Sequence, residues 1–163
     1  MSASLSRFVR CYHAKTDGWQ TTTFHAKCDG KGPTVTIIKV NDYIFGGYTD
    51  VSWHSSCSYS SSGKAFIFSL YNTNGYDPVK LIQYQYLNKA MYSCSSYGPT
   101  FGGNLGQHDI YTPNDAVNKK RAFTYCGSTY SPPPGNSVGF CSFFAGGSQF
   151  TPTDIEVFYE TTS

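Results

Sequence analysis

The stretch Thr34-Val-Thr-Ile-Ile-Lys-Val40, Asn41-Asp42, Tyr43-Ile-Phe-Gly-Gly-Tyr-Thr49 consists of two runs of β-branched and aromatic residues on either side of a two-residue turn sequence. Such side chains favour strands because they fit a pleated, half-buried surface. Asn41 and Asp42 tolerate the positive φ angles of a tight hairpin turn. Residues 34–49 therefore predict a β-hairpin.

Two adjacent glycines, Gly46 and Gly47, lie inside the second run, between Phe45 and Tyr48. Glycine within a strand marks either a β-bulge or a place where a neighbour comes too close for a Cβ atom. We therefore expect one of these two features here. Both positions should be intolerant of a larger side chain for backbone reasons.

Further runs with strand composition lie on both sides of the hairpin. Their short spacing is typical of an antiparallel meander. Residues 19–28 predict a short helix that Asp17 caps and Gly30 ends. The serine-rich residues 53–63 predict a surface loop, from which Trp53 turns back as an anchor. The remaining strand-like runs are residues 8–13, 65–71, 79–85, 91–94, 109–112, 122–126 and 153–159.

The composition supports one β-rich domain. Of the 163 residues, 17% are aromatic and 13% are charged, and the helix-favouring Glu occurs only as Glu156 and Glu160. A chain of this length can bury a substantial core in one domain. The expected fold class is mainly β (α+β): a two-sheet antiparallel β-sandwich of about eight to ten strands with one or two short flanking helices.

The charge and hydropathy patterns exclude two classes of partner. A formal net charge of +2 is far from the basic surface that nucleic-acid binding requires. No window approaches the length of an apolar membrane-spanning helix, so membrane insertion is not expected. Residues 1–10 lack the apolar centre of a signal peptide. The expected location is cytoplasmic, or secreted if a leader has been removed.

The six cysteines allow 15 pairings, so the sequence alone leaves their redox state open. Their density is below that of small disulfide-stapled scaffolds. The chain also lacks an Asn-x-Ser/Thr glycosylation site, which favours a reducing compartment. We therefore expect mainly reduced, buried thiols. The cysteines are Cys11, Cys28, Cys57, Cys94, Cys126 and Cys141.

The sequence contains no recognisable catalytic motif. It has no G-x-S-x-G elbow and no P-loop, and its ten carboxylates are scattered along the chain without a recognisable catalytic pattern. His25 and Cys28 have a spacing that suits a metal ion, but a second pair of ligands is missing. The prediction is a non-enzyme with no catalytic residues, no cofactor and no metal site.

Aromatic side chains are the strongest candidates for binding, because their faces stack on sugars or on partner proteins at little entropic cost. Packing competes with this role, and we expect roughly two thirds of the rings to fill the core. The favoured contact region is residues 52–63, with Trp53 as anchor and His54 and Tyr59 as adaptable contacts. A disordered connection is the competing interpretation of this region.

Several segments, taken in order, resemble the TLDc domain family across nearly the whole chain. These are residues 27–39 and 43–53, residues 63–70, residues 97–103 with 108–111, and Phe150 with residues 154–158. Residues 104–107 are an insertion relative to the family pattern. The family-motif positions, to which we assign structural roles, are Gly32, Pro33, Thr34, Phe45, Gly46, Gly47, Gly98, Pro99, Gly102, Gly103, Asp109 and Glu156.

The resemblance implies a TLDc-like domain over residues 8–160, with an N-terminal extension at 1–7 and a C-terminal tail at 161–163. It also implies a non-catalytic interaction domain, related to oxidative stress, that docks a protein partner such as a V-type ATPase subunit. Other classes remain open: a stand-alone structural or self-assembling protein, a small glycan- or metal-binding module, or an enzyme that acts on peroxides through a cysteine.

Overall fold

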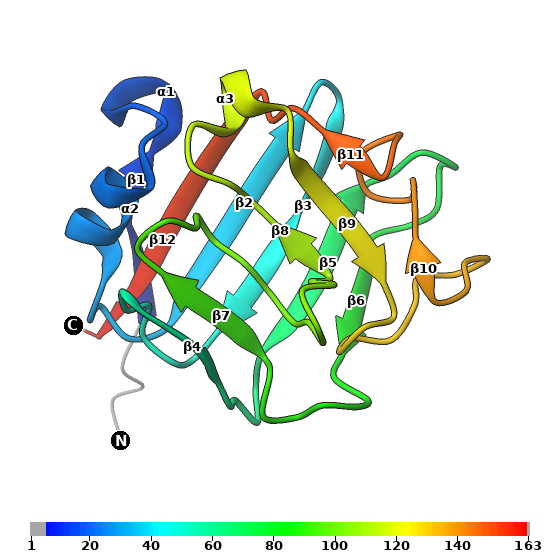
Figure 1. The fold of residues 1–163 in the computed structure, drawn as a ribbon, viewed down its shortest axis with the longest axis horizontal. Helices are drawn as coiled ribbons and strands as arrows, with labels where there is room; N and C mark the ends of the chain where they lie inside the picture. The colour runs from blue at the N-terminus through cyan, green and yellow to red at the C-terminus, as the bar shows by residue number, and fades with distance from the viewer. Residues whose placement is uncertain (1–5, 163) are drawn as a thin grey trace.

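The computed structural model describes residues 6–162, which contain twelve strands and three short helices (Figure 1). Residues 1–5 of the predicted extension and residue 163 of the predicted tail lie outside the described residues. The helices are α1 (Ala14–Asp17), α2 (Thr21–Cys28) and α3 (Ala116–Lys119). The strands are β1 (Ser6–His13), β2 (Thr34–Val40), β3 (Tyr43–Thr49), β4 (Ser56–Ser60), β5 (Phe66–Tyr71), β6 (Val79–Ile82), β7 (Met91–Cys94), β8 (Ile110–Tyr111), β9 (Ala122–Cys126), β10 (Gly139–Phe140), β11 (Gln149–Phe150) and β12 (Asp154–Thr162).

The strands form two layers, which confirms the predicted antiparallel sandwich. One layer is a six-stranded sheet with the order β1-β12-β2-β3-β5-β6. The other contains β10-β9-β11, β8 paired with β9, and the pair β4-β7. Isolated bridges from Phe101 to Met91 and to Ile110 connect β7 to β8. In Figure 1 the second layer lies in front of the six-stranded sheet.

The hairpin over residues 34–49 has the predicted bounds. β2 and β3 pair from Thr34↔Thr49 to Val40↔Tyr43, and Asn41 has a φ of 53° in the turn. Alternate residues of β2 are buried, with Ile38 among them. The period-2 pattern of side chains thus places one face of β2 on the core.

Close approach, rather than a bulge, explains the two glycines of β3. A Cβ atom on Gly46 would collide with the backbone oxygen of Thr36. A Cβ atom on Gly47 would lie 2.6 Å from the Phe101 ring of the opposite layer. The nearest register shift lies one step earlier, between Ile44 and Phe45. Gly46 therefore allows β2 to lie close to β3 within one sheet, and Gly47 allows the opposite layer to approach β3.

Aromatic rings fill the core, but fewer of them than predicted. Trp53 is 1% exposed, and its Nε1 donates a hydrogen bond to Thr34 Oγ1 at 2.8 Å, so it is the predicted anchor. The prediction of two thirds is wrong, because many tyrosines stay half-exposed where their hydroxyl groups reach water. Among the described residues, the buried aromatic side chains are Tyr12, Phe24, Phe45, Trp53, Phe101, Tyr130, Phe143, Phe144 and Phe150.

Three expected elements need correction. Within the expected serine-rich loop, Ser56–Ser60 forms β4 and pairs with β7. The expected helix over residues 19–28 is preceded by a separate turn of helix, because Gly18 at φ 101° ends α1 before α2 begins at Thr21. Asp17 does not cap α2, since its Oδ2 accepts a hydrogen bond from the His13 amide at 2.9 Å. β7 leaves the expected meander and joins the second layer.

The expectation of reduced cysteines is wrong. All six form disulfides, which join β1 to α2, β4 to β7, and β9 to the residue after β10. The expected burial holds for four cysteines, whereas Cys57 is exposed and Cys11 is half-buried. Sequence spacing could not reveal this pairing, because each partner lies on a different element. The pairs are Cys11–Cys28, Cys57–Cys94 and Cys126–Cys141.

A search of the described residues finds no helix that is both long and apolar enough to cross a membrane.

Candidate interaction surface

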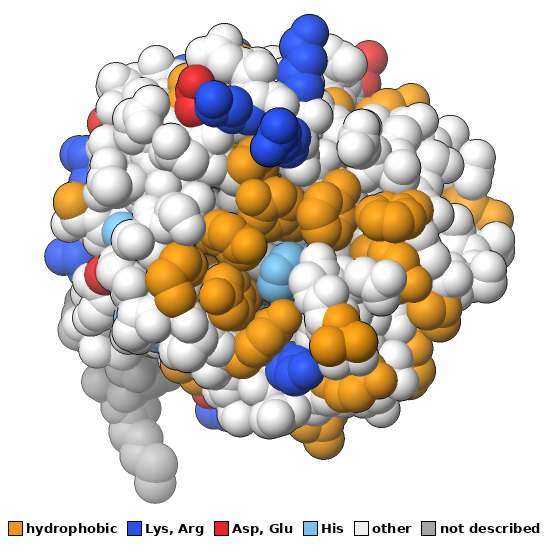
Figure 2. Space-filling view, in the orientation of Figure 1, with side chains coloured by type: hydrophobic (Ala, Val, Ile, Leu, Met, Phe, Trp, Pro, Cys, Tyr) orange, Lys and Arg blue, Asp and Glu red, His pale blue; other side chains and the backbone are white. Residues whose placement is uncertain are grey.

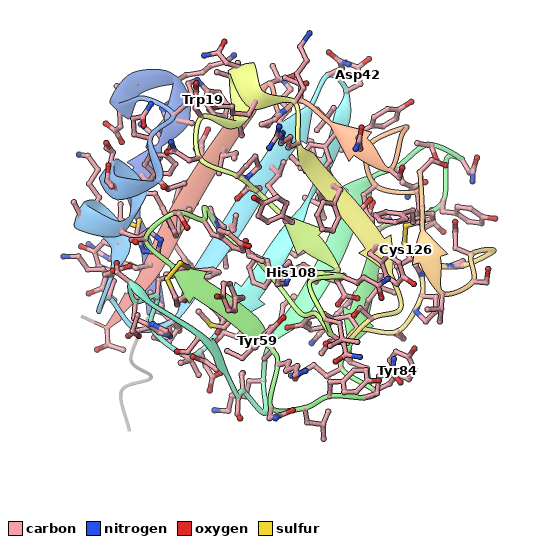
Figure 3. All side chains as sticks on the ribbon, viewed as in Figure 1. Trp19, Asp42, Tyr59, Tyr84, His108 and Cys126 are labelled. Carbon is pink, nitrogen blue, oxygen red and sulfur yellow. A yellow bond between two sulfur atoms is a disulfide. The ribbon has the colours of Figure 1, made fainter. Side chains whose placement is uncertain are left out.

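Five half-buried aromatic side chains surround His108 on the outer face of the second layer. We call this group, with the histidine at its centre, the aromatic surface. In Figure 2 the histidine lies in the middle of a field of hydrophobic side chains, and Figure 3 labels it together with Tyr59. The five rings are those of Tyr59, Tyr92, Tyr97, Tyr111 and Phe123.

Strand pairing brings these rings together. Tyr59 of β4 lies opposite Tyr92 of β7, with their ring centroids 4.8 Å apart. Tyr111 of β8 lies opposite Phe123 of β9, with a centroid distance of 5.0 Å. Tyr97 lies between the two pairs, 5.1 Å from Tyr92 and 4.9 Å from Tyr111. Directly paired residues share one face of a sheet, so the four strands present a continuous aromatic face.

His108 is 4% exposed, and its Nδ1 lies 2.8 Å from the Gly102 carbonyl oxygen. Burial lowers the pKa of this imidazole, although the bond to Gly102 opposes the shift. The ring is therefore neutral at physiological pH, and Nδ1–H donates to the carbonyl. Nε2 remains an acceptor, and within the described part of the chain no hydrogen bond to it is found. This nitrogen can accept a hydrogen bond from a ligand.

A buried carboxyl group, Asp109, follows the histidine in the chain. Asp109 Oδ1 accepts a bond from the Thr129 amide at 2.8 Å, and Oδ2 accepts bonds from the amides of Ser128 and Tyr130 at 3.1 and 3.2 Å. Burial raises the pKa of Asp109 to about 8, against the effect of these amides. Asp109 thus fixes the loop that follows β9 against the start of β8.

The two glycines before the histidine leave room for this arrangement. A Cβ atom on Gly102 would collide with Asp109 Oδ1, and one on Gly103 would lie 2.5 Å from His108 Nδ1. Both glycines also have positive φ angles, 68° and 135°. Both glycines therefore support the aromatic surface through the shape of the backbone. The insertion at residues 104–107 forms a turn beside them, and its Leu105 is 91% exposed.

Basic side chains lie at the rim of the aromatic surface. Lys89 Nζ is 5.2 Å from the Tyr59 ring centroid and 2.9 Å from Asn104 Oδ1. At the other side, the positive charge of Arg121 opposes the burial that raises the pKa of Tyr111. Lysine and arginine side chains lie above and below the hydrophobic field in Figure 2. The rim therefore favours an anionic partner.

The three predicted binding residues have different positions. Trp53 lies in the core and is too buried to contact a partner. His54 is half-buried and bonds to Ser56 Oγ at 2.7 Å and Ser60 Oγ at 3.1 Å, so its ring is fixed beside β4. Tyr59 alone belongs to the aromatic surface.

Sequence reasoning missed His108 and the other four rings of the aromatic surface. The signal was weak, because each ring lies in its own short strand or turn. The recurrence of outward-facing aromatic residues in each of the four strands β4, β7, β8 and β9 would have been the clue.

The other family-motif positions shape the backbone. Gly32 has a φ of 80°, and its amide donates to Ser52 Oγ at 2.8 Å. A Cβ atom on Gly98 would collide with Thr112 Oγ1, which in turn donates to the Pro99 carbonyl at 2.8 Å. The Pro33 carbonyl accepts a bond from the Glu160 amide at 2.9 Å. These contacts are consistent with the structural roles assigned to the motif.

The His25 and Cys28 pair is not a metal site. Cys28 is bonded to Cys11, so it has no thiolate to offer. His25 Nδ1 lies 2.7 Å from Asp29 Oδ1, and its Nε2 lies 2.8 Å from the Tyr97 carbonyl oxygen. Both ring nitrogens are thus engaged, and His25 connects α2 to the segment that carries Tyr97.

Comparison with known proteins places the chain in a family. It is similar to the MTOR-associated protein MEAK7 of Danio rerio, with 28% identity over 130 residues that cover 75% of this chain and 28% of the relative. The relative of the same name from Gallus gallus is 30% identical over 107 residues, covering 61% of this chain and 21% of that protein. The chain thus spans about a quarter of the length of the curated relatives it matches. The TLDc domain model matches residues 2–160. The chain therefore belongs to the TLDc domain family.

Proposed function

We propose that the chain is a non-catalytic docking domain that binds a protein partner through the aromatic surface. The observation that carries the proposal is the group of five half-buried rings around the free Nε2 of a neutral His108. Rigid aromatic rings supply large contact areas at low entropic cost, and they dominate the binding energy of many interfaces. The polar histidine nitrogen would fix the orientation of a partner hydroxyl or amide group.

The partner segment we expect is acidic and carries apolar or aromatic side chains. The basic rim favours the acidic groups, and the rings favour the apolar ones. Anchors would pack on the tyrosine rings, while carboxylates would approach Lys89 on one side and Arg121 on the other. Charges at an interface rim mainly affect the association rate and its dependence on salt. Binding should therefore weaken as the ionic strength rises.

Family membership supports two finer proposals about the partner. The resemblance suggests that it is a V-type ATPase subunit, in a role related to oxidative stress. The relatives carry the name MTOR-associated, so an MTOR-containing assembly is a second candidate.

The disulfides indicate the kind of compartment in which the chain would meet its partner. Three paired disulfides favour folding in an oxidising compartment, because cytosolic thiols are normally kept reduced. We therefore favour the secreted alternative over the cytoplasmic one. A cytosolic partner would meet the chain with its cysteines reduced, so binding should be measured in both states.

The absence of catalysis is part of the proposal and has its own support. With all six cysteines paired, no thiolate is available to attack a peroxide. Among the described residues no hydroxyl or thiol is hydrogen-bonded to His108 Nε2, as an activated nucleophile would require.

The test is a pull-down of purified V-type ATPase subunits, and separately of MTOR, by the immobilised chain with its disulfides intact and, in parallel, reduced. The double variant Tyr92→Ala, Tyr111→Ala should lose most of the recovered partner, because two central rings are removed. Tyr71→Ala is the matched control, since Tyr71 is 63% exposed on β5 and lies outside the aromatic surface. Equal recovery by a folded double variant would refute docking at this surface.

Self-association is a second candidate function, favoured by exposed apolar side chains beyond the aromatic surface. Phe140 is 64% exposed and packs on Tyr125 and Phe123 at its edge, and Ile82 is 60% exposed on the edge strand β6. Light scattering after size exclusion distinguishes the two functions. A stable oligomer that the Ile82→Ser, Phe140→Ser variant disrupts would favour self-assembly through these exposed side chains.

A further inference from the structure

We propose that His13, Asp154 and Glu156 form a binding site for one divalent transition-metal ion of the zinc or manganese class, at the junction of β1 and β12. The site is separate from the aromatic surface. It lies on the six-stranded sheet, at the side of the molecule where β1 and β12 run in Figure 1.

The strand register brings the three ligands to one place. His13, the last residue of β1, pairs directly with Glu156 of β12. Asp154 lies two residues earlier on β12 and therefore points to the same face, while Ile155 and Val157 point into the core. One ligand atom from each of the three side chains lies within 4.8 Å of the other two.

The distances suit three ligands on one side of an ion. His13 Nε2 is 2.7 Å from Asp154 Oδ2 and 3.7 Å from Glu156 Oε1. Ligands about 2.0–2.2 Å from a central ion lie at such separations from each other, so small side-chain rotations complete the geometry. One imidazole and two carboxylates are a common ligand set for zinc and manganese, and this arrangement leaves the opposite positions open for water.

A hydrogen bond to the other ring nitrogen prepares the histidine for this role. Thr16 Oγ1 lies 2.8 Å from His13 Nδ1. His13 Nε2 is itself hydrogen-bonded to Asp154 Oδ2 at 2.7 Å in the structure, so an ion would replace the proton between these two atoms while Nδ1–H donates to the hydroxyl. Such a partner, one step removed from the ion, fixes the tautomer in many metal sites.

The neighbouring groups leave the ligand atoms available. Arg10 Nη1 lies 3.3 Å from Glu156 Oε2, which leaves Oε1 facing His13. The Lys15 and Ile155 amides bond to Asp154 Oδ1, which leaves Oδ2 facing His13. The three side chains are 13–30% exposed, so an ion can enter from solvent. On the other side of His13 lies a cavity of about 190 Å³, which Thr16, Asp17, Arg10 and Lys27 also line.

The ion would act as a cross-link. β1 is an edge strand whose residues Ser6–Arg10 are exposed, and its interior end is tied to α2 by the Cys11–Cys28 disulfide. A metal at His13 would fasten the same strand to β12, near both ends of the described chain. Because the ion binds only the folded arrangement of ligands, it stabilises the native state.

Zinc and manganese binding should be measured by isothermal titration and by thermal unfolding. We expect one zinc ion per chain, and each tenfold excess of free zinc over its Kd should raise the Tm by about 3–5 °C. Magnesium should have little effect at the same concentration, because it prefers oxygen-only sites. The variants His13→Gln and Glu156→Gln should each lose the zinc-dependent shift.

His54→Gln is the matched control, because it removes a half-buried histidine elsewhere and should keep the shift. Glu156→Gln also removes the ion pair with Arg10. If this variant is too unstable, Asp154→Asn takes its place, and circular dichroism verifies that each variant is folded. A wild type without saturable zinc or manganese binding below millimolar concentration would overturn the site. Retention of full binding by the folded His13→Gln protein would overturn it as well.

Discussion

At the residue scale, the two glycines of β3 decide how closely its neighbours pack, Gly46 within the six-stranded sheet and Gly47 between the layers. Substitution tests this directly. Gly47→Ala should lower the free energy of unfolding by about 1–3 kcal/mol, because the new methyl group would lie 2.6 Å from the Phe101 ring. Gly46→Ala should cost more, since it meets the Thr36 backbone, which cannot rotate away. Urea denaturation measures both effects.

The matched control is Gly63→Ala. No heavy atom lies within 4 Å of a Cβ atom at Gly63, and this glycine does not have a positive φ. Its substitution should leave the stability unchanged or slightly increased. An equal loss for Gly63→Ala and Gly47→Ala would contradict the packing explanation.

A second prediction at the residue scale concerns Asp109 and the pH dependence of the stability of the protein. Burial raises the pKa of Asp109 to about 8, whereas the unfolded carboxyl titrates near 3.9. Between these values the native state holds a proton that the unfolded state has lost. The Asp109 contribution is therefore fully present below about pH 4 and decreases as the pH rises to about 8.

Asp109→Asn should remove this slope and also lower the stability by about 1–3 kcal/mol, because its NH₂ group would face backbone N–H donors. Urea midpoints between pH 6.5 and 8 isolate the effect. The pKa of His108 is lowered by burial, so its contribution to the stability of the protein decreases only below about pH 6.5. His108 therefore adds little to the pH dependence between pH 6.5 and 8. An identical pH slope in the wild type and the variant would show that Asp109 is already ionised.

At the scale of elements, β4 depends on its pairing with β7. Three of its five residues are exposed, and β7 is its partner in the sheet. Cys57 is the extra residue at a register shift, has a φ of 56°, and bonds to Cys94 of β7. The disulfide thus holds Tyr59 next to Tyr92. The sequence suggested a loop here because serine has little strand preference, whereas pairing to β7 decided otherwise.

Removal of this disulfide should therefore weaken docking. The variant Cys57→Ser, Cys94→Ser should lose about 2–4 kcal/mol of stability and most of its partner recovery. The matched variant Cys11→Ser, Cys28→Ser should lose comparable stability but keep its partner, because that bridge lies away from the aromatic surface. The comparison uses thermal unfolding and the pull-down together. Full partner recovery by the Cys57→Ser, Cys94→Ser variant would show that docking does not need the disulfide that holds β4 in place.

At the scale of the whole molecule, the three bridges make a prediction about the purified protein. Alkylation without reduction should leave the mass of the native-source protein unchanged, because every thiol is bonded. Alkylation after reduction should modify six cysteines. Six alkylated cysteines before reduction would show that the native thiols are free. This result would indicate a reducing compartment and remove the support for secretion.

The sequence by itself determined the β class and the central hairpin. Residues 34–49 carry β-branched and aromatic runs around Asn41-Asp42, and these are local preferences that do not need distant contacts. The strand over residues 122–126 and the closing strand were predicted for the same reason. The family motifs were also recognisable, because glycine and proline positions restrict the backbone locally.

Only the tertiary structure decided the cysteine pairing and the aromatic surface. Tyr59 and Phe123 are far apart in the sequence, and they belong to one face only because β4, β7, β8 and β9 assemble in one layer. The metal ligands His13 and Glu156 likewise meet through the pairing of β1 with β12. A period-2 pattern shows which side chains share a strand face, but it does not show which strands become neighbours. That choice depends on the free energy of burying the whole core, which no single segment contains.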